Sequence, residues 1–216
     1  MSMLIKICGL STEETLEAAL QAGADMIGFN FVAKSPRYIS LETARRLGAK
    51  VRGRARKAAL LVDADDAAIG ATIDALGADI LQLHGKETPE RVRAVASRFG
   101  LPVMKAVGVA TRDDVRAIAG YRGMADHILI DAKPPKDAAY PGGHGKVFDW
   151  TILEALDPGL SFMLSGGLSP ANVAEAIKRV RPWAVDVSSG VESVPGVKDV
   201  AKIRAFIAAA RDAAKV

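Results

Sequence analysis

Cysteine is nearly absent from this chain of 216 residues, which contains only Cys8. A single cysteine excludes a disulfide within the chain. There is also no apolar run long enough to cross a membrane, and Met1 leads directly into a predicted strand rather than into an apolar signal region. We therefore expect a cytoplasmic protein with no membrane partner.

The sequence also lacks the usual signatures of nucleotide, metal and nucleic-acid binding. No predicted strand is followed by Gly-x-Gly-x-x-Gly or by a Walker loop, and no two His or Cys residues stand at metal-ligand spacing. We therefore expect neither a cofactor nor a metal. The one basic cluster has no interleaved aromatic residues and consists of Lys50, Arg52, Arg54, Arg56 and Lys57. We interpret it as a solvated loop, with a nucleic-acid patch as the alternative. The net charge of +4 mildly favours anionic small molecules.

What the chain does contain is a regular alternation of strand and helix patterns. Strands are predicted over residues 4–8, 25–31, 58–62, 79–84, 103–109, 127–131, 161–164 and 184–187. Helices are predicted over residues 12–22, 41–49, 65–76, 91–99, 112–119, 148–156, 169–180 and 197–214. Near-continuous Val, Ile and Leu runs indicate parallel strands buried on both faces. Eight such units predict an α/β fold, a single-domain (β/α)8 TIM barrel over residues 1–216, with a doubly wound open sheet as the alternative.

In such a barrel the site lies at the carboxyl ends of the strands, and the loops after strands seven and eight commonly bind phosphate. Here those loops read Ser165-Gly166-Gly167-Leu168-Ser169 and Ser188-Ser189-Gly190-Val191-Glu192. Glycines let backbone N–H groups approach an anion, and each loop leads into the amino end of a predicted helical segment. Either loop alone could be an ordinary tight turn. Together they predict a phosphate site at Gly166, Gly167, Ser188, Ser189 and Gly190.

Polar side chains at other strand ends complete the candidate site. They are Cys8, Asn30, His84 and Asp131, together with Arg37 in the loop that follows the second strand. Plainer interpretations are a buried thiol, a hydrogen-bonded structural histidine, a helix cap for Asp131 and a solvated loop arginine. Strands one and six lie on opposite sides of an eight-strand ring. A substrate lying across the mouth could therefore touch both Cys8 and Asp131.

The first strand combines the only cysteine with a charge. Because side chains alternate along a strand, Lys6 and Cys8 share one face while Ile5 and Ile7 share the other. Lys6 is a candidate cation for lowering the pKa of the thiol. It could instead pair with a carboxylate in the barrel, and the pattern leaves both interpretations open.

These residues fall within motifs that together are typical of one family. The motifs are Lys6-Ile7-Cys8-Gly9, Gly28-Phe29-Asn30-Phe31, Ser35-Pro36-Arg37, Gln82-Leu83-His84-Gly85, Leu129-Ile130-Asp131, Gly143-His144-Gly145-Lys146 with Phe148-Asp149-Trp150, Leu164-Ser165-Gly166-Gly167-Leu168, and Asp186-Val187-Ser188-Ser189-Gly190-Val191-Glu192. With all of them in this order, the chain resembles phosphoribosylanthranilate isomerase of tryptophan biosynthesis over essentially its whole length. It departs at His144, where a Ser or Thr is expected between glycines.

The resemblance implies an Amadori rearrangement of N-(5-phosphoribosyl)anthranilate to 1-(2-carboxyphenylamino)-1-deoxyribulose 5-phosphate. It implies that Asp131 is the general acid that opens the furanose and that Cys8 is the general base that takes the C2 proton. Arg37 is the expected fork for the anthranilate carboxylate, and His84 and Asn30 are expected to bind substrate. The expected partner is a small phosphorylated aminosugar, not nucleic acid, and the chain is expected to be a monomer by default or a homodimer.

Two other functions fit parts of the sequence. Lys105 in the fifth predicted strand is expected to face the same mouth, and it could form a Schiff base in a lyase or an aldolase. A non-catalytic barrel that binds a sugar phosphate would keep the phosphate loops but lack the acid and the base. Cys8 and Asp131 are both present, which favours an enzyme. The fold alone does not decide among these functions.

Overall fold

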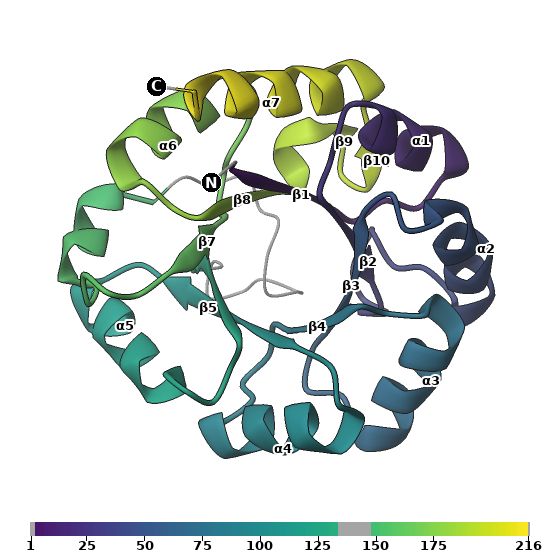
Figure 1. The fold of residues 1–216 in the computed structure, drawn as a ribbon, viewed down its shortest axis with the longest axis horizontal. Helices are drawn as coiled ribbons and strands as arrows, with labels where there is room; N and C mark the ends of the chain where they lie inside the picture. The colour runs from purple at the N-terminus through teal and green to yellow at the C-terminus, as the bar shows by residue number, and fades with distance from the viewer. Residues whose placement is uncertain (1–2, 134–147, 216) are drawn as a thin grey trace.

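The computed structural model describes residues 3–133 and 148–215, which contain one closed barrel of eight parallel strands (Figure 1). The strands follow one another in chain order: β1 (Leu4–Cys8), β2 (Met26–Asn30), β3 (Arg56–Leu61), β4 (Ile80–Leu83), β5 (Val103–Val109), β6 (His127–Ala132), β7 (Phe162–Leu164) and β8 (Ala184–Val187). Strand β8 pairs with β1 and closes the ring. The predicted barrel is therefore confirmed, and the open sheet is wrong. The glycine motif around His144 lies outside the described residues.

Helices form an outer ring around the barrel (Figure 1). They are α1 (Glu13–Gln21), α2 (Leu41–Val51), α3 (Asp66–Leu76), α4 (Pro89–Phe99), α5 (Arg112–Ala117), α6 (Val173–Val180) and α7 (Val200–Ala213), with the 3-10 helices η1 (Ile118–Tyr121), η2 (Trp150–Ala155) and η3 (Ser189–Val191). Ser40, Asp65 and Thr88 cap α2, α3 and α4, because each side-chain oxygen accepts a hydrogen bond from the backbone N–H three residues later. Short polar side chains thus fix where these helices begin.

The strands separate two apolar layers. The inner layer fills the barrel and consists of Met26, Ala58, Ile80, Met104, Ala106, Leu129, Met163 and Ala184. The outer layer, between barrel and helices, contains the residues of alternate parity, Ile5 and Ile7 among them. Lys6 and Cys8 consequently point into the barrel, as the alternation in β1 predicts.

Two predicted helices begin three or four residues later than their patterns indicate. The helix predicted over 197–214 begins at Val200, because residues on either side of Gly196 form a short antiparallel hairpin, β9 (Glu192–Val194) with β10 (Val197–Lys198). The helix predicted over 169–180 begins at Val173. Before it the chain turns, and the Ser169 N–H donates to Asn172 Oδ1 at 2.8 Å. Both loops are longer than predicted, and both follow the strands that carry the candidate phosphate site.

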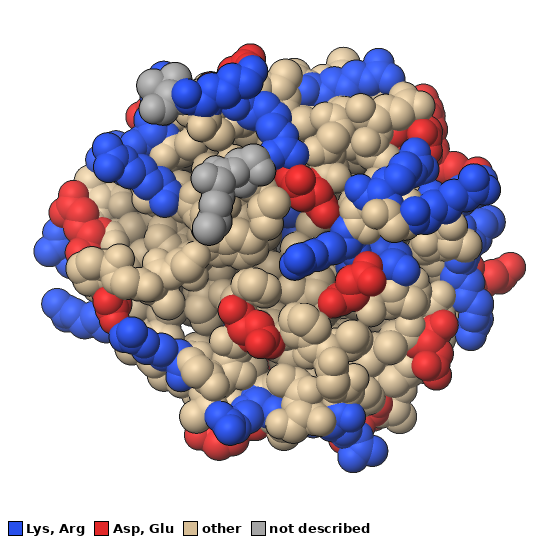
Figure 2. Space-filling model, viewed as in Figure 1, with Lys and Arg blue, Asp and Glu red and all other residues tan. Residues whose placement is uncertain are grey.

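Charged side chains of both signs lie next to each other over the face seen in Figure 2. The basic cluster extends from the last turn of α2 through the loop to the start of β3, and it is partly paired, since Lys50 contacts Glu13 at 2.9 Å and Arg54 contacts Glu17 at 2.8 Å. Such pairs are expected of a solvated surface. Within residues 3–133 and 148–215, no helix is both long and apolar enough to cross a membrane. Over the same ranges, no three His, Cys, Asp or Glu side chains group as a metal site.

Candidate active site

Cys8 ends β1 with its thiol inside the barrel, where the residue is only 4% exposed. Its neighbour across the sheet is Gly28 of β2, and a β-carbon at position 28 would lie 2.6 Å from Cys8 Sγ. Any larger residue would displace the thiol. Gly28 is not among the site residues that the sequence predicts, although a glycine inside a strand is a signal of close approach by another group.

Lys6 lies two residues before Cys8 on the same face of β1. It is fully buried and forms an ion pair with Asp186 of β8 at 2.8 Å. Ser165 Oγ donates to the other oxygen of Asp186 at 3.0 Å. Burial alone would lower the pKa of Lys6, but Asp186 and Cys8 outweigh burial and raise it. Of the two interpretations of Lys6, pairing with a barrel carboxylate is therefore confirmed. Asp186 is not among the site residues that the sequence predicts.

Lys6 also acts on the thiol as the other interpretation predicts, but its effect is smaller than that of burial. Burial raises the pKa of Cys8 above its ordinary value. Lys6 opposes that rise and so does Lys198, whereas Asp186 adds to it. The net result is a raised pKa, so Cys8 is a thiol rather than a thiolate in the free protein near neutral pH.

Asp131 and His84 meet at the mouth of the barrel. Asp131 Oδ1 accepts a hydrogen bond from the Ala132 N–H at 2.8 Å, and Asp131 Oδ2 lies 3.4 Å from His84 Nε2. The second contact lacks hydrogen-bond geometry, so His84 Nε2 is a buried nitrogen without a partner among the described residues. Such a nitrogen can bond a substrate group. His84 therefore lies beside the predicted acid, and its binding of substrate stays a prediction.

Cys8 and Asp131 come from strands on opposite sides of the ring. β6 carries Asp131, β1 carries Cys8, and β7 and β8 lie between them on the shorter path around the barrel. Both side chains are buried within a few residues of the carboxyl ends of their strands. Groups so arranged can act on two faces of one bound molecule.

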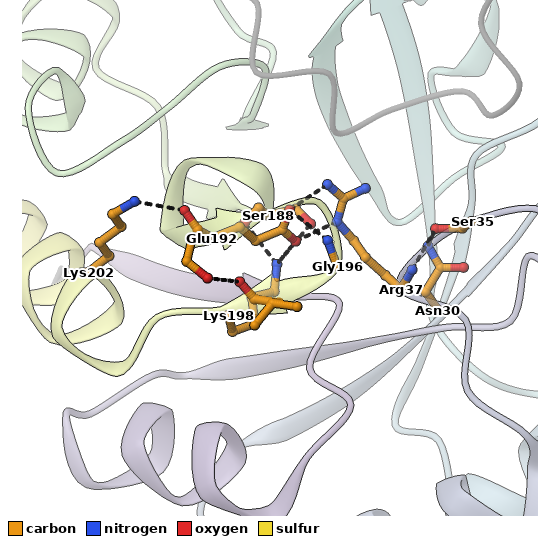
Figure 3. Close-up of polar contacts among 10 residues, drawn as sticks. Asn30, Ser35, Arg37, Ser188, Glu192, Gly196, Lys198 and Lys202 are labelled. Carbon is orange, nitrogen blue, oxygen red and sulfur yellow. Dashed lines mark hydrogen bonds and ion pairs between the residues drawn. The ribbon is translucent and has the colours of Figure 1, made fainter.

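Asn30 ends β2, and Arg37 lies in the loop that follows it (Figure 3). Asn30 Oδ1 accepts from the Val32 N–H at 2.8 Å, and Asn30 Nδ2 donates to Ser35 Oγ at 3.2 Å. Ser35 Oγ in turn accepts from the Arg37 N–H at 3.2 Å. Asn30 thus shapes the loop that carries Arg37, while its predicted contact with substrate is not tested.

Arg37 is buried, so its interpretation as a solvated loop residue is wrong. It donates from Nε and Nη2 to the two carboxylate oxygens of Glu192, at 2.7 and 2.8 Å. A β-carbon at Gly9 would lie only 2.7 Å from Arg37 Cδ, and Gly9 has φ +79°. Arg37 therefore packs over the residue that follows Cys8. Its role as a carboxylate fork for a ligand stays a prediction.

The two glycine loops pack against neighbouring backbone. Gly166 and Gly167 have φ of +87° and +69°, which favours glycine. A β-carbon at Gly166 would lie 2.5 Å from the backbone nitrogen of Ala132, and one at Gly190 would collide with the backbone oxygen of Leu168. The loop after β8 therefore lies directly on the loop after β7, as a site shared between them requires. Phosphate binding by these loops stays a prediction.

Lys105 does not face the mouth, and that prediction is wrong. Its neighbours Met104 and Ala106 belong to the inner layer, so Lys105 points outward among the helices. There Lys105 Nζ donates to Glu87 at 2.8 Å and to the backbone oxygens of Gly85 and Leu83 at 2.8 and 3.3 Å. An ammonium bound to three acceptors outside the barrel is not a nucleophile for a substrate in the mouth.

Lys105→Met is expected to reduce stability without abolishing chemistry in the barrel. Removing one partner of a buried ion pair leaves an uncompensated charge on Glu87, and we expect the free energy of unfolding to fall by about 3 kcal/mol. Urea unfolding measures that loss. Turnover per folded molecule should stay within about 2-fold of the wild type, because no reacting group is changed. Activity that disappears while the variant is still folded, or a borohydride-trapped adduct on Lys105 in the wild type, would contradict this assignment.

Known proteins resemble this chain over the whole barrel. A family model described as N-(5'phosphoribosyl)anthranilate (PRA) isomerase matches residues 5–209. The N-(5'-phosphoribosyl)anthranilate isomerase of Nitrobacter hamburgensis is 59% identical over 213 residues, which cover 99% of this chain and 95% of that protein. These matches include every strand that carries a candidate site residue.

Solved structures agree with the sequence matches. The phosphoribosyl anthranilate isomerase of Thermotoga maritima has a TM-score of 0.86 at 39% identity, covering 97% of this chain and 99% of that chain. A phosphoribosyl anthranilate isomerase in complex with reduced 1-(o-carboxyphenylamino)-1-deoxyribulose 5-phosphate has a TM-score of 0.83 at 36% identity, with the same coverage of both chains. The barrel described above is thus similar to one that holds a phosphorylated ligand.

Proposed function

Since the chain belongs to the N-(5'-phosphoribosyl)anthranilate isomerase family, we propose that Cys8 and Asp131 are the base and the acid of its reaction. That reaction is an isomerisation in tryptophan biosynthesis, from N-(5-phosphoribosyl)anthranilate to 1-(2-carboxyphenylamino)-1-deoxyribulose 5-phosphate. The observation that carries the proposal is the barrel order, in which β7 and β8 separate Cys8 on β1 from Asp131 on β6. A sugar lying across the mouth has one of these groups on either side.

The chemistry needs one proton donor and one proton acceptor. Asp131 donates a proton to the furanose ring oxygen, the bond from C1 to that oxygen breaks, and the nitrogen lone pair forms a C1=N bond. Cys8, in the thiolate fraction that its raised pKa leaves at neutral pH, then takes the proton from C2 and becomes a thiol, and the electron pair left behind forms a C1=C2 bond and neutralises the nitrogen. Protonation of C1 and loss of the hydroxyl proton on C2 give the aminoketose. The isomerisation moves protons only, so it requires no cofactor.

The substrate is anionic at both ends, and different residues bind the two ends. Gly166, Gly167, Ser188, Ser189 and Gly190 bind the phosphate, because their two loops lie against each other at the carboxyl ends of β7 and β8. Arg37 binds the anthranilate carboxylate, and His84 contacts the substrate beside Asp131. Asn30 contributes mainly through the loop that it holds.

We also propose that the enzyme acts in the cytoplasm, where reducing conditions keep a lone cysteine such as Cys8 as a thiol. Its partner is a small phosphorylated aminosugar. A monomer is the default proposal, and a homodimer is the alternative. Sedimentation of the purified protein distinguishes the two states.

The proposed reaction is tested by loss of anthranilate-type fluorescence when purified protein is added to N-(5-phosphoribosyl)anthranilate. Turnover supports the isomerase reaction. No turnover by a folded wild type would contradict it. A borohydride-treated sample serves as the control, since acid–base isomerisation leaves no covalent adduct for the reagent to trap.

The raised pKa of Cys8 predicts how its reactivity depends on pH. The thiolate is the form that reacts with iodoacetamide, so the alkylation rate should rise about 10-fold per pH unit for as long as the thiol stays protonated. Because burial raises the pKa above its ordinary value of 9.0, the rate should still be rising at pH 9. Mass spectrometry follows one site, as Cys8 is the only cysteine. A small free thiol is the control, and a plateau in the protein below pH 9.0 would contradict the prediction.

A further inference from the structure

Glu192 lies at the centre of a buried network that joins two loops far apart in sequence. It follows η3 directly, and the residue is 7% exposed. Glu192 Oε1 accepts from Arg37 Nε at 2.7 Å and from Lys198 Nζ at 2.8 Å. Glu192 Oε2 accepts from Arg37 Nη2 at 2.8 Å and from the Gly196 N–H at 3.2 Å (Figure 3). Both oxygens are thus fully engaged, and the bidentate contact fixes the plane of the Arg37 guanidinium.

Lys198 extends this network into the candidate phosphate loop. Besides Glu192, its Nζ donates to the backbone oxygen of Ser188 at 2.8 Å and to Ser188 Oγ at 3.2 Å. The three contacts use all three protons of the ammonium. A continuous chain therefore runs from Arg37 through Glu192 and Lys198 to Ser188 (Figure 3).

A second contact, independent of these charges, joins the same two loops. Gly196 turns the β9–β10 hairpin with φ +86°, and a β-carbon there would lie 2.6 Å from the backbone oxygen of Pro36. The hairpin thus lies directly against the residue that precedes Arg37. This close contact between the backbones of Gly196 and Pro36 holds the loop after β2 against the loop after β8.

The charges of the network suit a ligand with two anionic ends. Arg37 and Lys198 are both buried and share the single carboxylate of Glu192, so the three side chains carry a net positive charge. Burial would raise the pKa of Glu192, but the hydrogen bond from Arg37 and the charge of Lys198 hold it below the ordinary range. Glu192 therefore remains a carboxylate at neutral pH and keeps the two cations from repelling each other.

We propose that Glu192 is a positioning residue that sets the separation between the Arg37 guanidinium and the phosphate loop at Ser188, and so matches the site to the distance between the two anionic ends of the substrate. The inference rests on the proposed function, in which Arg37 binds the carboxylate and Ser188 the phosphate. Glu192 itself touches neither end. Its effect on binding passes through Arg37 on one side and Lys198 on the other.

The test uses anthranilate and inorganic phosphate as separate probes of the two ends, with dissociation constants measured by calorimetry. Glu192→Gln removes the charge but keeps the shape, so we expect both dissociation constants, and KM for the full substrate, to rise about 10-fold. A purely structural role would lower the melting temperature and leave the affinity of the folded protein unchanged. The matched control is Lys202→Met, because Lys202 Nζ donates to the backbone oxygen of Glu192, at 2.7 Å, and not to its carboxylate. That variant should bind both probes as the wild type does.

Two further variants keep the inference testable if Glu192→Gln does not fold. Glu192→Asp keeps the charge but is one methylene shorter, so it should weaken both probes as well. Lys198→Met removes the bonds to Ser188 and to Glu192 Oε1 but leaves the bidentate contact between Glu192 and Arg37, so it should weaken phosphate more than anthranilate. Unchanged phosphate affinity in these folded variants would overturn the inference while leaving the proposed function in place. A wild type that binds neither probe would overturn both.

Discussion

Alanine at position 8 is expected to lower kcat/KM for N-(5-phosphoribosyl)anthranilate by about 100-fold or more, which is the loss typical of a missing general base. The thiol of Cys8 lies inside the barrel, and no other cysteine exists to replace it. Lys6, the buried cation on the same face of β1, is held by Asp186 with a raised pKa, so it remains protonated and cannot accept the proton. The fluorescence assay that follows loss of the substrate measures the change directly.

Cys8→Ser is the matched variant for this prediction. Serine fills nearly the same space beside Gly28, so it should fold, bind inorganic phosphate as the wild type does, and still be slow. A hydroxyl is a far weaker acid than a thiol and is almost never ionised at working pH. If either variant retained activity within about 10-fold of the wild type while folded, the reaction would stand and Cys8 would lose its role.

The first and fifth strands show what periodicity can and cannot predict. In β1 the charge of Lys6 and the thiol of Cys8 alternate with two isoleucines, so the inward face can be read from the sequence, and the structure confirms it. In β5 the residues on both sides of Lys105 are apolar, because a parallel strand in a barrel is buried on both faces. The sequence of β5 therefore does not indicate which parity faces inward, and the outward direction of Lys105 depends on Glu87, 18 positions away.

The network around Glu192 is harder still to predict. Arg37 and Glu192 stand 155 positions apart, and nothing near either residue indicates a buried partner. An arginine in a polar loop is usually solvated, and only a tertiary partner of opposite charge makes its burial favourable. The hairpin that presents Glu192 is equally hidden, since β9 has three residues and β10 has two. Motif order predicts the barrel and the strand ends, whereas the contacts that orient the site arise only when distant loops pack together.

Asn at position 131 is expected to lower kcat by about 10²–10⁴-fold, the range for removal of a general acid. The substitution is nearly isosteric, and an amide oxygen can still accept the hydrogen bond that Ala132 N–H donates to Asp131 Oδ1. We therefore expect folding and phosphate affinity to be preserved while the ring-opening step fails. Kinetics of substrate loss, together with calorimetry of inorganic phosphate, separate the two effects.

The main alternative to Asp131 as the general acid is His84. The Nε2 atom of His84 lies only 3.4 Å from Asp131 Oδ2 and could deliver the proton instead. His84→Asn keeps a nitrogen donor but removes the titratable ring. If Asp131 is the acid, Asp131→Asn should lose far more activity than His84→Asn, and the double variant should be little worse than Asp131→Asn alone. If instead His84→Asn lost about 100-fold or more in kcat while Asp131→Asn kept most of its turnover, the acid would be His84. In that case Asp131 would orient the imidazole, and the substrate would still be flanked by its acid and its base from opposite sides of the barrel.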